Sequence, residues 1–215
     1  MSNTAFNLAA HVLARGQETP EKIALAVLGL TGAERWSYGR LINAVRGCGS
    51  WLARQADPGD RILIRPGNTP AYPVLYLGAI AAGMVPVATS PLLTGPEIAR
   101  MAGIVRPRLT VADPGIAVPG GPVLAADLPA WEAALPCDWH LGDPQREAYV
   151  VFTSGTSGTP MAVRHAHRAI LARGMMHRGW EGLTAQDRLL HAGAFNWTYT
   201  MGTGLLDPGR WAPPR

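Results

Sequence analysis

Five hydroxyl side chains and two glycines stand together at residues 153–160, in the order Thr-Ser-Gly-Thr-Ser-Gly-Thr-Pro. Glycine allows backbone conformations with φ > 0 and lets backbone N–H groups come close to a ligand. Successive N–H groups in such a loop form a concave site for anions, and hydroxyl groups add hydrogen-bond donors without adding charge. The segment could therefore bind phosphate, although its composition is equally compatible with a polar surface turn.

The segment differs from two better-known motifs. The P-loop of nucleoside triphosphatases has a lysine after its second glycine, and residues 153–161 contain no lysine. The Gly-x-Ser-x-Gly turn of esterases has three residues between its glycines, whereas Gly155 and Gly158 have two between them. The pattern therefore indicates neither of these motifs and gives no serine nucleophile.

The elements expected to position this segment form an open α/β sheet. Residues 58–112 alternate between strand and helix patterns, and this spacing is typical of parallel βαβ units. The expected strands are residues 61–65, 84–88 and 109–112, with a later one at 188–192, and the expected helices are residues 71–82 and 94–105. The helix at 71–82 is apolar all round, which indicates burial between two layers.

Further elements are predicted on both sides of this unit. Residues 23–38 predict an N-terminal hairpin that turns at Thr31 and Gly32. Residues 148–153 are an apolar run, predicted as a buried strand, that leads directly into the hydroxyl-rich segment. Residues 113–147 are rich in Pro, Gly and Ala without a sustained period, so we expect a loop-heavy connector there.

The composition excludes several classes of protein. The 215 residues are 47% hydrophobic and 16% charged, which is ample apolar surface for the core of one large or two small domains. The formal charge is +4 and the arginines are scattered without a basic run, so we expect no nucleic-acid partner. The most apolar run, residues 74–88, is shorter than a membrane span and contains Pro86. The N-terminus lacks the features of a secretory signal, so we expect a cytoplasmic protein without a membrane partner.

Residues 149–167, YVVFTSGTSGTPMAVRHAH, resemble the phosphate-loop signature of the adenylate-forming superfamily. This superfamily includes acyl-CoA synthetases, firefly luciferase and the adenylation domains of peptide synthetases. Other segments are similar to the same family, namely Trp-Ser-Tyr at 36–38, Pro-Gly-Asp-Arg-Ile at 58–62 and the apolar residues 77–83. The resemblance implies an α/β fold of the acyl-CoA synthetase and luciferase type, as an incomplete N-terminal domain with parallel βαβ units and an N-terminal hairpin.

The resemblance also implies an ATP-dependent acid–CoA ligase. In this reaction a carboxylate attacks the α-phosphate of ATP to give an acyl-adenylate and pyrophosphate, and the thiol of CoA then displaces AMP. The implied substrates are a small or aromatic carboxylic acid, ATP with Mg²⁺, and CoA, and the implied chemistry has no catalytic nucleophile from the protein. Residues implied to hold the ATP phosphates are Thr153, Ser154, Gly155, Thr156, Ser157 and Gly158. Residues implied to line the acid pocket, with ordinary core packing as the alternative, are Phe195, Asn196, Trp197 and Tyr199.

The chain departs from the family pattern in two respects. Met161 stands where the family usually has lysine, which implies a weaker grip on the phosphates. The chain is also shorter than family members, so residues 1–208 are interpreted as a partial AMP-binding domain and the C-terminal domain is expected to be absent. Residues 209–215 do not resemble the family and would follow from a one-base deletion in the coding sequence. We therefore expect an inactive truncated ligase, and the alternative is a non-catalytic binding fragment or a pseudoenzyme that acts with a partner chain.

A zinc site is the remaining interpretation of the histidines. Cys137, His140, His165 and His167 could supply ligands, but zinc sites usually combine two short-spaced ligand pairs and these spacings are loose. We therefore expect no metal-binding set of side chains. His165 and His167 are instead interpreted as the start of the helix that follows the hydroxyl-rich segment.

Overall fold

The computed structural model describes residues 4–154, 160–180, 182–184 and 186–208. The predicted residues Gly155, Thr156, Ser157 and Gly158, and the tail at 209–215, lie outside the described part of the chain. The elements are α1 (Leu8–Leu13), the 3₁₀ turn η1 (Ala14–Gln17), β1 (Ile23–Gly29), β2 (Gly32–Ser37), α2 (Tyr38–Leu52), β3 (Arg61–Arg65), α3 (Ala71–Ala81), β4 (Val85–Ala88), α4 (Gly95–Val105), β5 (Leu109–Ala112), β6 (Val123–Ala125), α5 (Leu128–Ala133), β7 (Glu147–Ser154), β8 (Pro160–Ala166), α6 (Ala169–Trp180) and the π-helical segment η2 (Thr200–Leu206).

The centre of the fold is a six-stranded sheet with the order β6-β5-β3-β4-β7-β8. Its first five strands run parallel, and β8 returns antiparallel to β7. The connection from β4 to β5 passes beyond β3 to its other side, so the sheet grows outward in two directions, as open α/β sheets do. The predicted parallel βαβ units are therefore confirmed.

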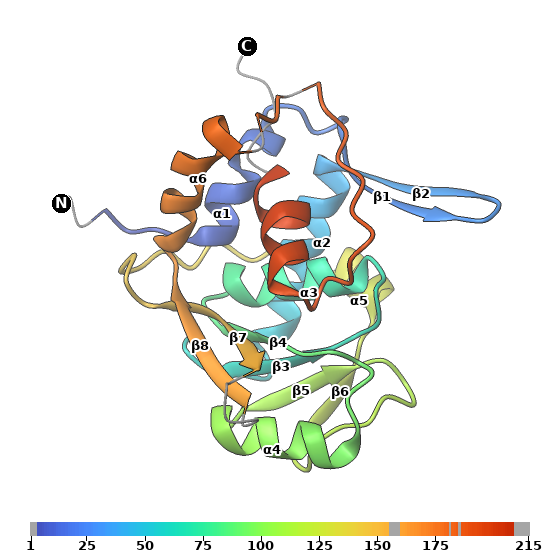
Figure 1. The fold of residues 1–215 in the computed structure, drawn as a ribbon, viewed down its shortest axis with the longest axis vertical. Coiled ribbons are helices and arrows are strands. Elements are labelled where there is room, and N and C mark those ends of the chain that lie inside the picture. Colours follow the sequence, from blue (N-terminus) through green and yellow to red (C-terminus); the bar gives the residue numbers. More distant parts are fainter. Residues whose placement is uncertain (1–3, 155–159, 181, 185, 209–215) are drawn as a thin grey trace.

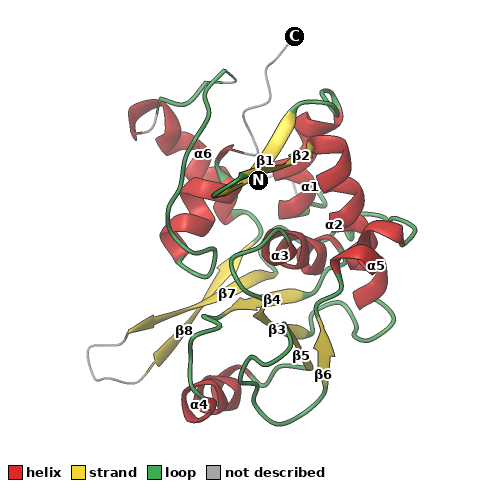
Figure 2. Cartoon of the chain, turned by 90° about the vertical axis from the view of Figure 1, so that its right-hand side faces the viewer, coloured by secondary structure: helices red, strands yellow, loops and turns green. Residues whose placement is uncertain are grey.

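Helices cover both faces of the sheet (Figure 2), with α4 on one face and α2 and α3 on the other. The side chains of β3 alternate between these faces, because successive strand residues point in opposite directions. Ile62 and Ile64 pack in the large core with α1, α2 and α3, whereas Leu63 packs in a smaller core with Ile98 of α4. Both cores hold the strands that lead to the candidate site.

The helix α3 is buried along its whole length, as its apolar sequence predicts. It lies between the sheet and α2, and a Cβ atom on Gly78 would stand 2.8 Å from the Cβ of Cys48. Glycine at this position therefore permits the close approach of α2 and α3. The helix α4 begins with a capping box of Thr94 and Glu97.

The expected N-terminal hairpin is confirmed as β1 and β2, which project from the body of the molecule (Figure 1). The prediction of a loop-heavy connector at residues 113–147 is only partly correct, because this segment contains β6 and α5. Asp127 caps α5 by accepting a hydrogen bond from the N–H of Ala130, and Trp131 is fully buried against Trp51 of α2. The strand expected at 188–192 is wrong, since its described residues pair with no other strand. None of the helices in the described ranges is long and apolar enough to cross a membrane.

Candidate active site

The hydroxyl-rich segment follows the carboxyl end of a central parallel strand. Val87 and Ala88 of β4 pair with Val150 and Val151 of β7, so β4 and β7 end at the same edge of the sheet. Ligands of open α/β sheets bind outside this edge. Of the six residues predicted to hold phosphate, the structure places the first two at the end of β7 and describes no others. Phosphate binding by the whole segment stays a prediction.

Thr153 and Met161 face each other across the hairpin of β7 and β8. Directly paired residues of antiparallel strands project from the same face of the sheet. The side chain of Thr153 is exposed, and that of Met161 is 60% exposed. A cationic side chain at position 161 would therefore lie beside Thr153, whereas methionine brings no charge to this position.

A buried arginine, Arg65, occupies the same edge at the end of β3. Its Nη1 donates to the carbonyl oxygen of Ser90 at 2.8 Å, and its Nη2 donates to those of Pro91 and Leu93 at 3.3 and 3.2 Å. Burial lowers the pKa of this guanidinium, although arginine remains protonated in proteins. Because no carboxylate among the described residues pairs with it, Arg65 adds positive potential to the edge where β7 ends.

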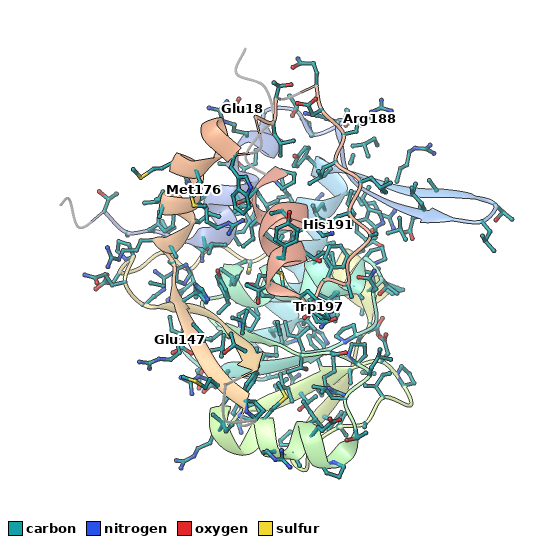
Figure 3. The ribbon with its side chains drawn as sticks, in the orientation of Figure 1. Glu18, Glu147, Met176, Arg188, His191 and Trp197 are labelled. Atoms are coloured by element: carbon teal, nitrogen blue, oxygen red, sulfur yellow. The ribbon has the colours of Figure 1, made fainter. Side chains whose placement is uncertain are left out.

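The aromatic segment predicted to line an acid pocket is anchored at this edge by Phe195. The N–H of Phe195 donates to Oδ1 of Asn68 at 3.0 Å, and its ring stacks on Tyr72 with the centroids 6.0 Å apart. Trp197 and Tyr199 are 66% and 62% exposed, and Figure 3 shows Trp197 on the segment beside η2. Neither they nor Asn196 line the two cavities described below. Their role in acid binding stays a prediction.

A cavity of about 120 Å³ lies between the sheet and the helical segments α6 and η2, and we call it the β7–α6 cavity. It is lined by Tyr149, Val151, His165, Ala169, Arg173, Thr198, Met201, Gly202 and Leu206. Sequence reasoning missed this group, apart from naming His165. The alternation of side chains along a strand could have predicted that Tyr149 and Val151 lie on the same face of β7 as Thr153.

The polar groups of this cavity are uncharged or paired. Arg173 and Asp207 form a two-point ion pair, in which Nε donates to Oδ1 at 2.9 Å and Nη2 donates to Oδ2. Burial and the nearby charge of Arg173 lower the pKa of His165, so its ring is neutral at pH 7. Burial raises the pKa of Tyr149 to about 12, so its hydroxyl stays protonated. These lining groups therefore bring no net charge to the cavity.

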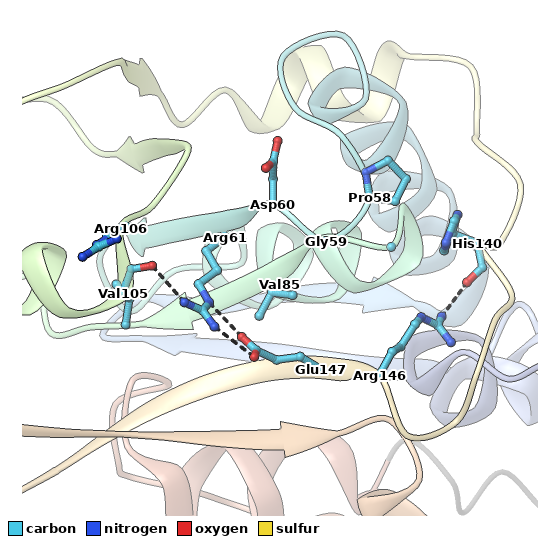
Figure 4. Close-up of a pocket in the computed structure, with 11 residues that line it drawn as sticks. Pro58, Gly59, Asp60, Arg61, Val85, Val105, Arg106, His140, Arg146 and Glu147 are labelled. Carbon is cyan, nitrogen blue, oxygen red and sulfur yellow. Dashed lines mark hydrogen bonds and ion pairs between the residues drawn. The ribbon is translucent and has the colours of Figure 1, made fainter.

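A cavity of about 430 Å³ opens at the opposite edge of the sheet, where β3, β4 and β7 begin (Figure 4). Arg61 donates to both carboxylate oxygens of Glu147 at 2.9 and 3.0 Å, and its Nη1 donates to the carbonyl oxygen of Val105. The Arg61–Glu147 pair joins the starts of β3 and β7 across β4. This cavity therefore lies at the start of β7, beside the ion pair that holds the strand, and not at the edge of the sheet where Thr153 lies.

We expect the substitution Glu147→Gln to lower the free energy of unfolding by about 1 kcal/mol, because it leaves the partly buried Arg61 without its counter-charge. The matched control is Glu132→Gln, whose partner Arg40 is more exposed and whose loss should cost less. Urea denaturation measures both variants. Equal losses would show that the pair at the start of β7 has no special role in stability.

The expectation that His165 and His167 begin the helix after the hydroxyl-rich segment is wrong, because His165 lies in β8 and α6 begins at Ala169. His165 stacks on Tyr149 with the ring centroids 4.6 Å apart. His167 is fully buried, and its Nδ1 accepts a hydrogen bond from the N–H of Leu8 at 2.9 Å. Within the described ranges, no three histidine, cysteine, aspartate or glutamate side chains gather as a metal site.

A parallel α/β sheet with a Ser/Thr/Gly-rich segment at its carboxyl edge has the architecture of nucleotide-binding α/β proteins. The sequence model of the AMP-binding enzyme family matches residues 12–208. The chain therefore belongs to the family of AMP-binding enzymes.

The curated relatives include aromatic acid–CoA ligases and a long-chain-fatty-acid–AMP ligase of Mycobacterium tuberculosis. The chain is 29% identical over 180 residues to the anthranilate–CoA ligase of Pseudomonas aeruginosa, an alignment that covers 74% of this chain and 34% of that protein. It is 27% identical over 197 residues to the benzoate–CoA ligase of Thauera aromatica, with 82% and 37% covered. The chain thus spans about a third of the length of these relatives.

Solved structures share the fold. VinN superposes with a TM-score of 0.84 at 22% identity, over 97% of this chain and 58% of that one. A benzoate CoA ligase from Burkholderia xenovorans LB400 gives a TM-score of 0.82 at 23% identity, over 96% and 44%. The fold expected from the resemblance, that of an N-terminal part of an adenylate-forming enzyme, is confirmed.

Proposed function

We propose that this chain holds ATP and a small or aromatic carboxylic acid for the adenylation step of an acid–CoA ligase. The observation that carries the proposal is the Thr-Ser-Gly-Thr-Ser-Gly-Thr-Pro segment after β7, in a chain of the AMP-binding family. Relatives named for anthranilate and benzoate support an aromatic acid as the substrate. CoA as the second substrate follows from the same names and belongs to the proposal for the whole protein.

The residues at the sheet edge would act by binding and orientation. Donors of the segment that begins at Thr153 would hold the phosphates, and the charge of Arg65 would favour polyphosphate at this edge. A carboxylate oxygen of the acid then attacks the α-phosphorus, the bond to pyrophosphate breaks, and no protein nucleophile takes part. Mg²⁺ supplies charge neutralisation between phosphate oxygens when bound.

Titration of the chain with Mg·ATP tests the proposal. We expect Thr153→Val to weaken ATP affinity about fivefold, since it removes one hydroxyl donor while keeping the shape and the exposed position of the side chain. Thr153→Ser keeps the hydroxyl and should retain the affinity of the native chain. Calorimetry measures the dissociation constants.

The outcomes of this titration separate the possible functions. No affinity for ATP, or equal affinity of the Val and Ser variants, would contradict the proposal. Acid-dependent exchange of label between pyrophosphate and ATP would show adenylation directly. ATP binding without such exchange would favour a non-catalytic binding protein instead.

A further inference from the structure

The cavity at the start of β3, β4 and β7, which we call the amino-edge cavity, has no part in the proposed function. Its volume of about 430 Å³ lies within the range of small-molecule sites. It is lined by the turn before β3, the end of α4, the starts of β4 and β7, and the connector before β7. It lies beside Glu147 at the start of β7 (Figure 4), whereas Thr153 lies at the other end of that strand. A ligand bound here would therefore be separate from the nucleotide.

The two carboxylates that line the amino-edge cavity are both paired with arginine. Arg61 donates to both oxygens of Glu147, and Nη1 of Arg164 lies 3.6 Å from Oε2 of the same carboxylate. The carboxylate of Asp60 lies 3.9 Å from Nε of Arg108. Because these arginines already balance both carboxylates, neither one neutralises a further cation at the cavity.

Two lining arginines, Arg106 and Arg146, form no ion pair with a carboxylate in the described part of the chain. Arg146 donates to the carbonyl oxygens of Phe6, Asp143 and His140, which uses three of its five N–H groups. Its Nε is enclosed by protein, so one N–H of Nη2 remains for a ligand. Burial lowers the pKa of this guanidinium despite the nearby charge of Asp143, and an anion beside it would offset the cost of desolvation.

The backbone of Arg106 adopts a conformation that favours glycine. Arg106 ends α4 with φ 48° and ψ 65°, and within the described ranges every other residue with a positive φ is a glycine. Helices commonly end on a glycine in this conformation, because a Cβ atom is unfavourable there. The side chain of Arg106 is exposed and makes no hydrogen bond or ion pair among the described residues. Contacts within the described fold therefore give no reason for arginine here, and such strained positions cluster at ligand sites.

Arg106 and Arg146 lie on opposite sides of the cavity, with Val85 between them (Figure 4). Arg106 precedes β5 and Arg146 precedes β7, and the sheet places β3 and β4 between these two strands. Because neighbouring strands are about 4.8 Å apart, β5 and β7 are roughly 14 Å apart. The two arginines therefore suit anionic groups at the two ends of one ligand better than a single compact ion.

We propose that the amino-edge cavity binds a small organic dianion, in which an apolar spacer separates one anionic group at Arg106 from another at Arg146. The spacer would lie against Val85 and Val105, which are each 2% exposed. Five arginines and two carboxylates line the cavity or pair with its lining, so its positive potential also attracts such a ligand. This site goes beyond the proposed function, because its occupation requires neither ATP nor Thr153.

Suberate and octanoate are matched probes for this inference, because they differ only in the second carboxylate. Labelling the valine methyl groups with ¹³C allows each probe to be titrated into the 215-residue chain. We expect saturable shifts of the Val85 and Val105 signals with suberate. Octanoate should bind about tenfold more weakly, since it lacks one charge-assisted contact. Val111 of β5, which is buried and does not line the cavity, should not respond to either probe.

Two substitutions of Arg106 separate ligand binding from stability. Arg106→Ala and Arg106→Gly should both weaken suberate about tenfold, because both remove the guanidinium. Arg100→Ala removes the same charge from an exposed position of α4 outside the cavity, so this control should retain the affinity. Arg106→Gly should also raise the melting temperature by about 2 °C, because glycine relieves the strain of the positive φ.

Three results would overturn the inference. The first is a failure of the Val85 and Val105 signals to respond to suberate, and the second is equal affinity for suberate and octanoate. The third is an equal loss of affinity in Arg106→Ala and Arg100→Ala, which would show only a response to net charge. Thr153→Val should leave suberate binding unchanged, so the outcome for this site is independent of the outcome for ATP.

Discussion

Acidification from pH 7 to pH 4 is expected to cost the folded protein about 3 kcal/mol through His167 alone. Burial and the charge of Arg146 lower the pKa of this histidine to about 3. In the unfolded chain the pKa of the ring is about 6.5. Between pH 3 and pH 6.5 the ring is therefore protonated in the unfolded state and neutral in the folded state. Stability is therefore complete above pH 6.5, falls as the pH drops, and levels off below about pH 3.

Urea denaturation at pH values between 7 and 4 measures this loss. His167→Gln removes the titrating ring but keeps an acceptor for the N–H of Leu8, so its stability should fall much less over this range. His165 has a lowered pKa as well and contributes a slope of the same sign in both proteins. An unchanged slope in His167→Gln would show that the imidazole is protonated without unfolding.

The hydrogen bond between Leu8 and His167 is one of several contacts that hold the N-terminal segment against the rest of the fold. The side chain of Asn7 is 1% exposed and donates through Nδ2 to the carbonyl oxygens of Ile80 and His140. Arg146 donates to the carbonyl oxygen of Phe6 at 2.7 Å. The N-terminal segment is thus joined to α3, to the connector and to the residue that follows β8, so acid destabilisation at His167 acts on the contact between this segment and the end of β8.

The elements that sequence reasoning recovered have strong local signals. The strand at 61–65, the apolar helix at 71–82 and the capped helix at 94–105 lie within one residue of their predicted bounds. β6 has three residues and α5 has six, which is too short for a hydrophobic period to develop. The start of α5 was nevertheless readable, since Asp127 followed by Pro129 is a helix-start pattern.

In the candidate site, too, local sequence patterns predicted some residues and not others. The hydroxyl-rich segment is contiguous, so the sequence alone located it at the end of a buried strand. In the sequence, Arg65 is only a charged residue at the end of a predicted strand. Its burial is possible because carbonyl oxygens 25 to 28 residues further along the chain accept its hydrogen bonds. The pairing of Arg173 with Asp207 likewise joins residues 34 positions apart. No local pattern predicts such contacts, because they depend on how the elements pack.

The substitution Met161→Lys is expected to raise the affinity of the chain for Mg·ATP roughly tenfold to thirtyfold, by charge-assisted hydrogen bonding to phosphate. Met161 pairs directly with Thr153 and is 60% exposed, so a lysine fits there without disturbing the core. The gain should add to the effect of Arg65, which reaches the edge from the other face of the sheet and is held by carbonyl oxygens. Calorimetric titration at low and high salt measures it, and salt should reduce it.

The control for net charge is Met175→Lys on α6. Met175 is 84% exposed and does not pair with the strand that carries Thr153, so the variant changes the total charge equally without placing it beside the phosphates. Equal gains from both lysines would mean that ATP responds only to the overall charge of the protein. A gain confined to position 161, and lost again in the double variant with Thr153→Val, would place the nucleotide at the end of β7, because neighbouring contacts to one ligand are coupled whereas distant ones are additive.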